Sequence, residues 1–548
     1  MILRFIVSIS CCLVAFACGD SSTNDPTPPE DTTPTYYKDV APIIEQHCLS
    51  CHESGGIGAA GGYQYDSYES VVEHANAIKN ATTMRRMPPW GAVGDSTCGE
   101  FQHSQWMAQQ DVDTLAAWVD SGMLKGNESD FVSEGIPAVT HLTGDITEIK
   151  NNINYAPKPL GGPIAQYDDY RCNLAANPFS DTKFITGSDV IPGNKNIVHH
   201  VLVMLVDLDA YVDGAVDDPT TEGDQRLTNR DLINVLSKVD DVDGVERAGW
   251  PCFSMGGSIQ EYAGLGYNGD NPQIAMGKLG QAAAAVVPSK ITAFMPPRDV
   301  DGNITGAPVV VTSKIAIRGM PVVWAPGINP LQLPEGTGII VPKNMAFVVQ
   351  THYNLYQQTG NPTDTTTIKF TTTTMVGRAA TITLVDQMLR GHLTGTAPFQ
   401  IDVGHGDDNL FKASWDITPQ DLSSMFGTGP QVLNQAKLLG LLPHMHERGR
   451  KITLQYYSDA GSEDGTCSIK VDHWNFNWQL AYYLTTPMAL DENHHFKITC
   501  EWNTAGLDAP ITPGWGTRNE MCLMGFITSV PVWCLGIGDA SCSDQPPI

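Results

Sequence analysis

The stretch KNIVHHVLVMLVD, residues 195–207, is an apolar, β-branched run of strand length that contains two adjacent histidines. Runs of this kind, bounded by turn residues, predict buried strands. Five further strand-like runs are separated by Gly, Pro, Asn and Asp: MAFVVQTHYNLYQ, TTIKFTTTTM, RKITLQYYSD, HHFKITCEWN and EMCLMGFITSV. Their spacing indicates antiparallel β-sandwiches over the region 140–548.

The segment before residue 140 predicts helices instead. Residues 36–48, YYKDVAPIIEQHC, and residues 110–123, QDVDTLAAWVDSGM, both have apolar side chains three and four apart. We expect the second helix to run from residue 111 to near residue 122. A Gly-rich loop and a Pro-broken segment separate the two helices. Residues 36–130 are therefore predicted to form a small all-α domain.

Length and composition limit the organisation and the partners. A chain of 548 residues exceeds one core, which favours three or four domains. Asp and Glu outnumber Lys and Arg by 60 to 32, and binding of nucleic acid needs clustered cations, so we expect no nucleic-acid partner. The acidic residues 207–243 include a helical pattern and are predicted to be a solvated surface excursion, with a calcium loop as the alternative.

The first residues are typical of an export signal. Residues 1–18, MILRFIVSISCCLVAFAC, combine one early Arg, an apolar stretch and small residues near the end. Ala15 to Ala17 would suit ordinary signal peptidase, whereas the same residues followed by Cys18 resemble a bacterial lipobox. Residues 19–35 are then a polar, disordered tether. We favour a lipoprotein that is exported to the bacterial periplasm or cell surface and anchored to a membrane through lipidated Cys18.

A C-x-x-C-H motif opens the helical segment. Cys48 and Cys51 have the spacing that attaches the vinyl groups of a haem, and His52 is placed to bind its iron. A dithiol redox site and half a zinc site are the alternatives.

Met87, in RRMPPW, is the candidate second axial ligand of that haem. Met84 is a near competitor, and a core methionine is the purely structural alternative. The segment resembles small c-type cytochrome domains, in which a Met before Pro-Pro-Trp is a familiar distal ligand. The resemblance implies a covalent haem c that acts as an electron acceptor and relay.

The opening stretch carries the first candidate metal ligands. Neighbouring side chains of a strand face opposite ways, so at least one of His199 and His200 is buried and needs partners. A lone histidine in such a place would be a satisfied core residue. His352 lies in another strand-like run, with Gln350 two residues earlier on the same face.

A second group occurs late in the chain. His444 and His446, in LLPHMHERG, are two residues apart, which places both imidazoles on one side of a strand. Imidazoles without Cys or carboxylates in their motifs favour copper or zinc, and a methionine in the set favours copper that cycles through Cu(I). Met521, in NEMCLMGF, is available for that role.

With these motifs, the region 140–548 resembles the copper type II, ascorbate-dependent monooxygenases, the family of peptidylglycine α-hydroxylating monooxygenase and dopamine β-hydroxylase. The resemblance rests on four motifs in family order. It implies two all-β, antiparallel, jelly-roll-like sandwiches, residues 140–375 and 376–548, with one copper on each.

The resemblance also assigns roles residue by residue. The copper that stores an electron would be held by His199, His200 and His352. The copper that binds O2 and faces the substrate would be held by the catalytic set His444, His446 and Met521. Tyr170 matches a family tyrosine just before a cysteine. The implied disulfides are Cys172–Cys252 and Cys500–Cys522, and the other cysteines of the region cannot be paired from the sequence: Cys98, Cys467, Cys534 and Cys542.

The activity implied is hydroxylation of a C–H bond with O2, which consumes two electrons and two protons. Family members take electrons from ascorbate, so an ascorbate-like molecule or a redox protein is the expected external donor. A fused haem domain suggests a relay, because a tethered donor has a high effective concentration at its acceptor. We expect it to reduce the copper at His199, His200 and His352.

The expected substrate is a small organic molecule. Leu442, Leu523 and Gly525 stand where the peptide-amidating family member has an Arg, an Asn and a Tyr that grip a carboxylate. A pocket without these groups cannot bind an anion in that way. A peptide ending in glycine is therefore not expected, and a more apolar molecule is.

Two other functions compete. A non-catalytic copper and haem lipoprotein, acting in electron transfer or metal handling, would not couple O2 uptake to a product. A zinc hydrolase would need a general-base Glu, and Glu447 beside His446 would face away on a strand. The remaining histidines are expected at the surface or in turns: His47, His405, His473, His494 and His495.

Overall fold

The computed structural model describes residues 33–535, apart from internal gaps. The gaps are 55–57, 59–61, 96, 138–140, 160–166, 216–225, 243–246, 253–271, 295–300, 302, 304, 306–312, 327, 357, 359, 396–398, 405–407, 424–428, 459–463 and 515–517. The predicted leader with Cys18, most of the tether, His405 and Cys542 lie outside the described residues. Within the described part of the chain, no helix is both long and apolar enough to cross a membrane.

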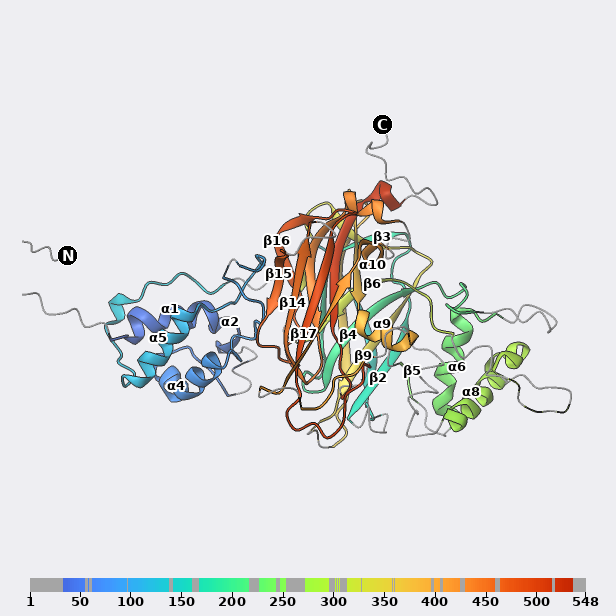
Figure 1. Ribbon diagram of the computed structural model, residues 1–548, viewed down its shortest axis with the longest axis horizontal. Coiled ribbons are helices and arrows are strands. Elements are labelled where there is room, and N and C mark those ends of the chain that lie inside the picture. Colours follow the sequence, from blue (N-terminus) through green and yellow to red (C-terminus); the bar gives the residue numbers. More distant parts are fainter. Residues whose placement is uncertain are drawn as a thin grey trace, which may run out of the picture.

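The N-terminal lobe is a small helical domain (Figure 1). Its elements are η1 (Tyr36–Val40), α1 (Ala41–His47), α2 (Leu49–His52), α4 (Tyr68–Thr83), α5 (Gln109–Asp120) and the short η2 (Glu128–Asp130). Apolar residues at helical spacing form its core, with Ile44, Val71 and Trp118 each at most 1% exposed. The hydroxyl of Ser67 caps α4 by accepting a hydrogen bond from the Ser70 N–H. Helix α5 matches the predicted second helix to within two residues.

The rest of the described chain is built on three sheets. A nine-stranded sheet has the order β1-β10-β3-β8-β11-β18-β13-β16, with β7 on β3. Its strands are β1 (Ile146–Tyr155), β3 (Lys183–Ile191), β7 (Leu331–Gln332), β8 (Thr337–Val341), β10 (Asp364–Thr373), β11 (Arg378–Val385), β13 (Lys437–His444), β16 (Tyr482–Ala489) and β18 (Leu523–Pro531). The five-stranded sheet contains β5 (Trp250–Pro251), β2 (Asp168–Ala175), β9 (Ala346–Asn354), β4 (Val198–Val206) and β6 (Ile317–Trp324), in that order. The four-stranded sheet contains β12 (Leu410–Ile417), β17 (His495–Asn503), β14 (Gly449–Tyr457) and β15 (Thr466–Val471).

Two sandwiches share the nine-stranded sheet. One half of it packs on the five-stranded sheet, where Val203 and Ile368 belong to one apolar core. The other half packs on the four-stranded sheet, where Phe526 and Ile498 belong to a second core. The halves join where β8 and β11 pair in parallel, while the other pairs of the described strands are antiparallel.

The five-stranded sheet is buried on both faces. Helices α6 (Asn229–Val242) and α8 (Pro272–Val286) lie on its outer side (Figure 1), and Met204 and Val348 pack in the same cluster as their side chains. Burial on both faces explains the continuous apolar run of β4. Two shorter helices, α9 (Gln387–Thr394) and α10 (Pro419–Ser423), belong to the C-terminal half.

Helix α6 corrects one prediction. The acidic residues 207–243 were expected to form a solvated excursion, yet Leu232, Leu236 and Val239 of α6 are at most 1% exposed. They repeat at a spacing of three and four and face α8. Of the acidic residues of α6, Asp231 is half-buried and Asp240 is buried in an ion pair with Arg171, so acidic composition did not indicate exposure here.

Candidate metal centre

His199 and His200 both face one cavity because β4 begins with a bulge. The pairing of β4 with β9 shifts between Val198 and His200, so that two steps along β4 oppose one step along β9. One metal-ligating atom from each of His199, His200 and His352 lies within 4.8 Å of the others. The expectation that adjacent strand residues face opposite ways is therefore wrong at this position.

His352 is oriented by two residues of β2. Its Nε2–H donates a hydrogen bond of 2.9 Å to Asp168 Oδ1, and the Tyr170 ring stacks on it with centroids 3.9 Å apart. Because Nε2 carries the proton, Nδ1 is the nitrogen that can bind a metal. It lies 3.3 Å from His200 Nδ1. A carboxylate behind a ligating imidazole is the usual arrangement at metal sites.

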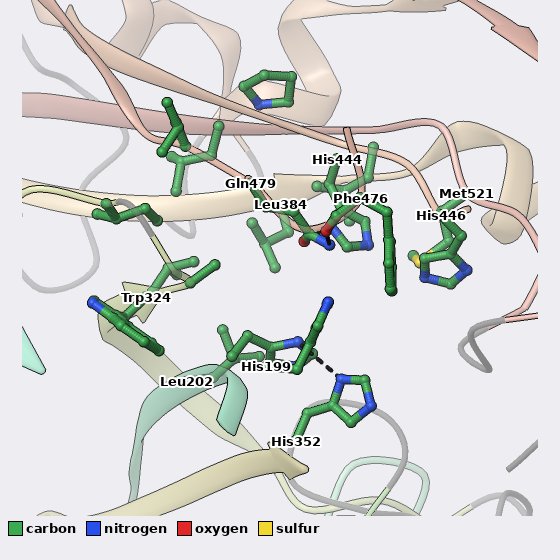
Figure 2. Close-up of a pocket in the computed structure, with 18 of the residues that line it drawn as sticks. His199, Leu202, Trp324, His352, Leu384, His444, His446, Phe476, Gln479 and Met521 are labelled. Atoms are coloured by element: carbon green, nitrogen blue, oxygen red, sulfur yellow. Dashed lines mark hydrogen bonds between the residues drawn. The ribbon is translucent and has the colours of Figure 1, made fainter. Parts of the chain in front are cut away.

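His444 and His446 present the other nitrogen. His444 ends β13, and its Nδ1–H donates to Gln479 Oε1 at 2.7 Å. The Nδ1–H of His446 donates to the Asn519 carbonyl at 3.0 Å. Both Nε2 atoms are then left for a metal. Met521 is 1% exposed, and its sulfur lies beside the His446 ring (Figure 2).

Glu520 fixes this second group. Its buried carboxylate accepts hydrogen bonds from the backbone N–H groups of His446 and Arg448, at 3.1 and 2.7 Å, and from Trp502 Nε1 at 3.0 Å. Burial nevertheless raises the pKa of Glu520 to about 7. These bonds tie the loop that carries His446 to the residue before Met521.

Burial keeps all five imidazoles neutral. It lowers the pKa of His444 to about 4 and that of His446 to about 3. The pKa values of His199, His200 and His352 also fall well below 6.5, first through burial and then through neighbouring imidazoles. The neutral imidazole is the form that binds a metal, so both groups are ready to do so at neutral pH.

The two groups line a single cavity of about 90 Å³. Figure 2 shows His199 and His352 on one side of it and His444, His446 and Met521 on the other. The rest of the wall is mainly apolar and includes Leu202, Val323, Trp324, Leu384, Leu442 and Leu523. Among the described lining residues none is Asp, Glu, Lys or Arg. The cavity therefore brings the six candidate ligands together in an apolar environment.

The three positions from which an apolar substrate is expected lie in or behind this wall. Leu442 and Leu523 line the cavity. Gly525 stands behind it, where a Cβ atom would lie 2.8 Å from Leu442 Cβ and 3.0 Å from Leu384 Cδ2. The glycine thus leaves space for two leucines, and apolar surface occupies the region.

Phe476 separates the cavity from a polar cleft. Its ring stacks on His199 at 4.4 Å between centroids and meets His446 edge-on at 6.0 Å. It also lines a cleft of about 600 Å³ that includes Asp168, Lys195 and Glu447. Phe476 and His199 are common to both spaces, so they form the wall between them.

Sequence reasoning missed four residues of the centre: Asp168, Gln479, Glu520 and Phe476. Asp168 and Glu520 had a usable signal, because each is an acidic residue within two positions of a predicted site residue, Tyr170 or Met521. Gln479 and Phe476 had none, because only the fold of β13 and β16 brings their loop to the histidines. Gln350, which was predicted, lines the cavity and donates to the Cys252 carbonyl at 3.2 Å.

Both disulfides implied by the resemblance are present, Cys172–Cys252 and Cys500–Cys522. A third joins Cys98 to Cys467, two cysteines that the sequence left unpaired. Cys534 is also disulfide-bonded.

The C-x-x-C-H residues lie together in the helical domain. Cys48 follows α1, whereas Cys51 and His52 belong to α2, and both cysteines are free thiols. The Nδ1–H of His52 donates to the Tyr63 carbonyl at 2.6 Å, which leaves Nε2 available. Tyr65 stacks on the His52 ring at 4.5 Å.

Met87 and Met84 differ in exposure. Met84 is 55% exposed at the end of α4, whereas Met87 is half-buried.

The other histidines are mostly peripheral, with one correction. His47 was expected to face solvent, but its side chain is 17% exposed and lies 3.9 Å from Asp111. His494 bonds to the Tyr456 hydroxyl, and His495 stacks on Tyr457. His473 is exposed.

Residues 432–530 match the family model of the copper type II ascorbate-dependent monooxygenase, C-terminal domain. This match supports the monooxygenase family. The matched residues include His444, His446 and Met521, and the family uses copper. No curated protein matches the chain. A solved structure titled "Crystal Structure of the STIV MCP" is 8% identical and covers 71% of this chain and 98% of its own, with a TM-score of 0.20.

Proposed function

We propose that this protein is a copper-dependent monooxygenase that hydroxylates a C–H bond of an organic substrate with O2. The observation that carries the proposal is the convergence of five imidazoles and one thioether on one apolar cavity. The family match over residues 432–530 supports copper and monooxygenase chemistry.

The donor atoms suit copper. Three neutral imidazoles in one group, and two imidazoles with a soft thioether in the other, are ligand sets that copper accepts in both its oxidation states. Bound copper would supply one-electron redox chemistry and the site of O2 activation. Asp168, Gln479 and the Asn519 carbonyl fix which nitrogen of His352, His444 and His446, respectively, faces the metal.

The two groups have different roles in this proposal. His199, His200 and His352 hold the copper that stores an electron, and His444, His446 and Met521 hold the copper at which O2 and substrate meet. The reaction consumes R–H, O2, two electrons and two protons and yields R–OH and water. The apolar wall excludes water from the reacting C–H bond.

The substrate is small and apolar in its reacting part. Leu442 and Leu523 line the cavity, and none of its described lining residues carries a formal charge at neutral pH. A free carboxylate would have to lose its hydration without a partner, which is strongly unfavourable. A peptide ending in glycine is therefore excluded by the proposal.

The helical domain carries a haem c in this proposal, and its residues fit the group. Cys48 and Cys51 are free to form thioether bonds, and His52 Nε2 is free to bind iron because Nδ1 donates to Tyr63. Met87 is the proposed second axial ligand. The domain receives electrons from an external ascorbate-like donor or redox protein and passes them to the coppers.

The cellular setting is proposed from the sequence alone. The leader and the tether support export to the bacterial periplasm or cell surface, with Cys18 as a lipid-modified membrane anchor.

Metal analysis and the haem spectrum of the purified chain test the cofactors, and two coppers with one covalent haem are expected. O2 uptake is then measured with a panel of apolar and carboxylate-bearing substrates. We expect one hydroxylated product per O2 for an apolar substrate and none for His446→Ala. The matched control is His473→Ala, an exposed imidazole in the same sandwich, which should behave like wild type. If copper and haem are reduced and reoxidised but no hydroxylated product forms, the protein is instead the non-catalytic copper and haem protein.

A further inference from the structure

The segment between α4 and α5 of the helical domain packs against the C-terminal sandwich. Residues 90–102 run along β15 and β16, the edge strands of two sheets. Isolated bridges join Ala92 to Val471 and Phe101 to Leu484. The Cys98–Cys467 disulfide lies between these bridges. The helical domain is therefore firmly attached to the sandwich that carries His444. Figure 1 shows it on the side of that sandwich where β15 and β16 lie.

Tyr482 is the centre of this attachment. The Trp90 ring meets it edge-on with centroids 5.0 Å apart, and Phe101 packs on it at 5.5 Å. The Gly91 N–H donates to the Tyr482 hydroxyl at 3.2 Å. A Cβ atom at Gly91 would lie 2.8 Å from Val471 Cγ1, so only glycine allows this close approach.

The two ends of the same segment are held together in the helical domain. The Arg85 guanidinium donates to the Met107 carbonyl and to Gln109 Oε1 and stacks over the Trp106 ring at 4.6 Å. Met87 lies between Arg85 and Trp90. Three residues of chain span at most about 11 Å, so the proposed haem ligand lies close to the Trp90 contact.

Tyr482 is also close in the sequence to residues of the metal centre. Gln479, three residues before it, accepts the hydrogen bond from His444 Nδ1, and its own Nε2 donates to the Phe476 carbonyl at 2.9 Å. Leu480, between Gln479 and Tyr482, lines the cavity. Residues 479–482 thus connect the contact between Trp90 and Tyr482 to Gln479. Gln479 is in turn hydrogen-bonded to the candidate copper ligand His444.

We propose that Trp90 and Tyr482 are positioning residues that couple the helical domain to His444, so that electrons from the haem enter the metal centre on the side of His444, His446 and Met521. The inference rests on the proposed function. Each transfer moves one electron, with Fe(II) oxidised to Fe(III) and Cu(II) reduced to Cu(I), and no bond is made or broken. This direction differs from the expectation from the sequence, which had the first histidine group reduced directly.

The test follows the haem rather than turnover. The haem of the oxidised holoprotein is photoreduced by a flash without O2, and its reoxidation is recorded by absorbance. We expect Trp90→Leu to slow reoxidation at least tenfold while haem spectrum and copper content stay unchanged. Phe411→Leu, a half-buried aromatic of β12 in the same sandwich, is the matched control and should keep the wild-type rate.

Two further variants locate the acceptor. His200→Ala, which keeps the second group intact, should retain fast reoxidation, and His446→Ala, which keeps the first group intact, should lose it. The opposite pattern, or an unchanged rate in Trp90→Leu, would overturn the inference and leave the proposed function standing. A protein without haem or copper would overturn the proposed function itself.

Hydrogen exchange of the metal-free protein gives a readout independent of cofactors. Trp90→Leu should raise exchange at the amides of Gly91 and Val93, which donate to Tyr482 and to the Lys470 carbonyl. Trp90→Phe, which keeps an aromatic ring, should leave exchange near the wild-type level. If Trp90→Leu does not fold, Tyr482→Leu replaces it in the flash experiment with the same expected loss, and a wild-type rate there would overturn the inference.

Discussion

At the scale of single residues, the metal centre depends on groups behind the ligands. Asp168 accepts the Nε2–H of His352 and also a hydrogen bond from Asn354 Nδ2, both at 2.9 Å. Without the carboxylate, His352 loses both its tautomer preference and its orientation.

We therefore expect Asp168→Ala to lower copper affinity at the first group by roughly 10- to 100-fold. The imidazoles of the second group are oriented by Gln479 and the Asn519 carbonyl instead, so this group should keep its affinity. Copper titration followed by electron paramagnetic resonance measures the two sites separately. Asp181→Ala, at an exposed position, is the control. Equal loss at both sites would mean that Asp168 acts on the fold rather than on His352.

Asp386 gives a second residue-scale prediction. It precedes α9, and its Oδ1 caps the helix by accepting a hydrogen bond from the Leu389 N–H at 2.8 Å. Burial raises the pKa of Asp386 from 3.8 to about 7. A carboxyl group whose pKa is raised in the folded state stabilises least where it is ionised, so stability falls as pH rises from 3.8 to about 7.

Asp386→Asn keeps the acceptor and removes the charge. The free energy of unfolding of the variant should exceed that of wild type by an amount that grows between pH 4 and 7 and then levels off, at up to about 4 kcal/mol. Urea unfolding at several pH values measures the difference. A constant difference across this range would show that Asp386 does not titrate in the folded state.

Spacing made the six candidate ligands predictable, but the residues that position them have no pattern in the sequence. The H-H and H-x-H pairs stand out because imidazoles are rare in apolar strands. Gln479 and Phe476 could not be predicted, since ordinary polar and aromatic residues in a loop acquire a role only from the strands beside them. The bulge at His199 was equally hidden, because nothing in the sequence of β4 marks the shift of register.

At the scale of elements, the strand-like runs of residues 140–548 predicted the strands better than the helices. Strands β4, β9 and β17 lie within runs that were predicted as strands, and β14 begins one residue before its run. Helix α8 was not predicted, because its Gly- and Ala-rich sequence has no distinct polar and apolar faces. Contact with α6 and the outer face of the five-stranded sheet determines its position.

The segment of residues 90–102 closes the edges of β15 and β16, which would otherwise expose unpaired backbone groups. Replacing both Cys98 and Cys467 with Ser should lower the stability of the C-terminal sandwich by about 2–5 kcal/mol. Thermal unfolding and limited proteolysis report the change, with cleavage expected within residues 90–102. Met375→Ser, which removes an exposed sulfur, serves as the control. An unchanged melting temperature would mean that the bridges and the Trp90 contact suffice.

At the scale of the whole molecule, the two sandwiches form one body. The nine-stranded sheet runs through both, and Ile382, Leu439 and Ile527 of its C-terminal half belong to the core of the N-terminal sandwich. Each candidate metal group is therefore fixed to the same sheet framework.

We expect the two sandwiches to unfold in a single calorimetric transition. The helical domain has a separate core and should give its own transition. Ile382→Ala, in the shared region, should destabilise both sandwiches together by about 2–5 kcal/mol. Ile44→Ala, in the helical core, is the control and should shift only the other transition. Two resolved transitions for the sandwiches would contradict the shared core.

The Cys98–Cys467 bond also constrains biogenesis. Its cysteines are 369 residues apart, so Cys98 leaves the ribosome long before its partner. A nascent chain could instead oxidise Cys98 with Cys48, Cys51 or Cys172, each of which arrives much earlier. In the proposed holoprotein, haem attachment would remove Cys48 and Cys51 from this competition.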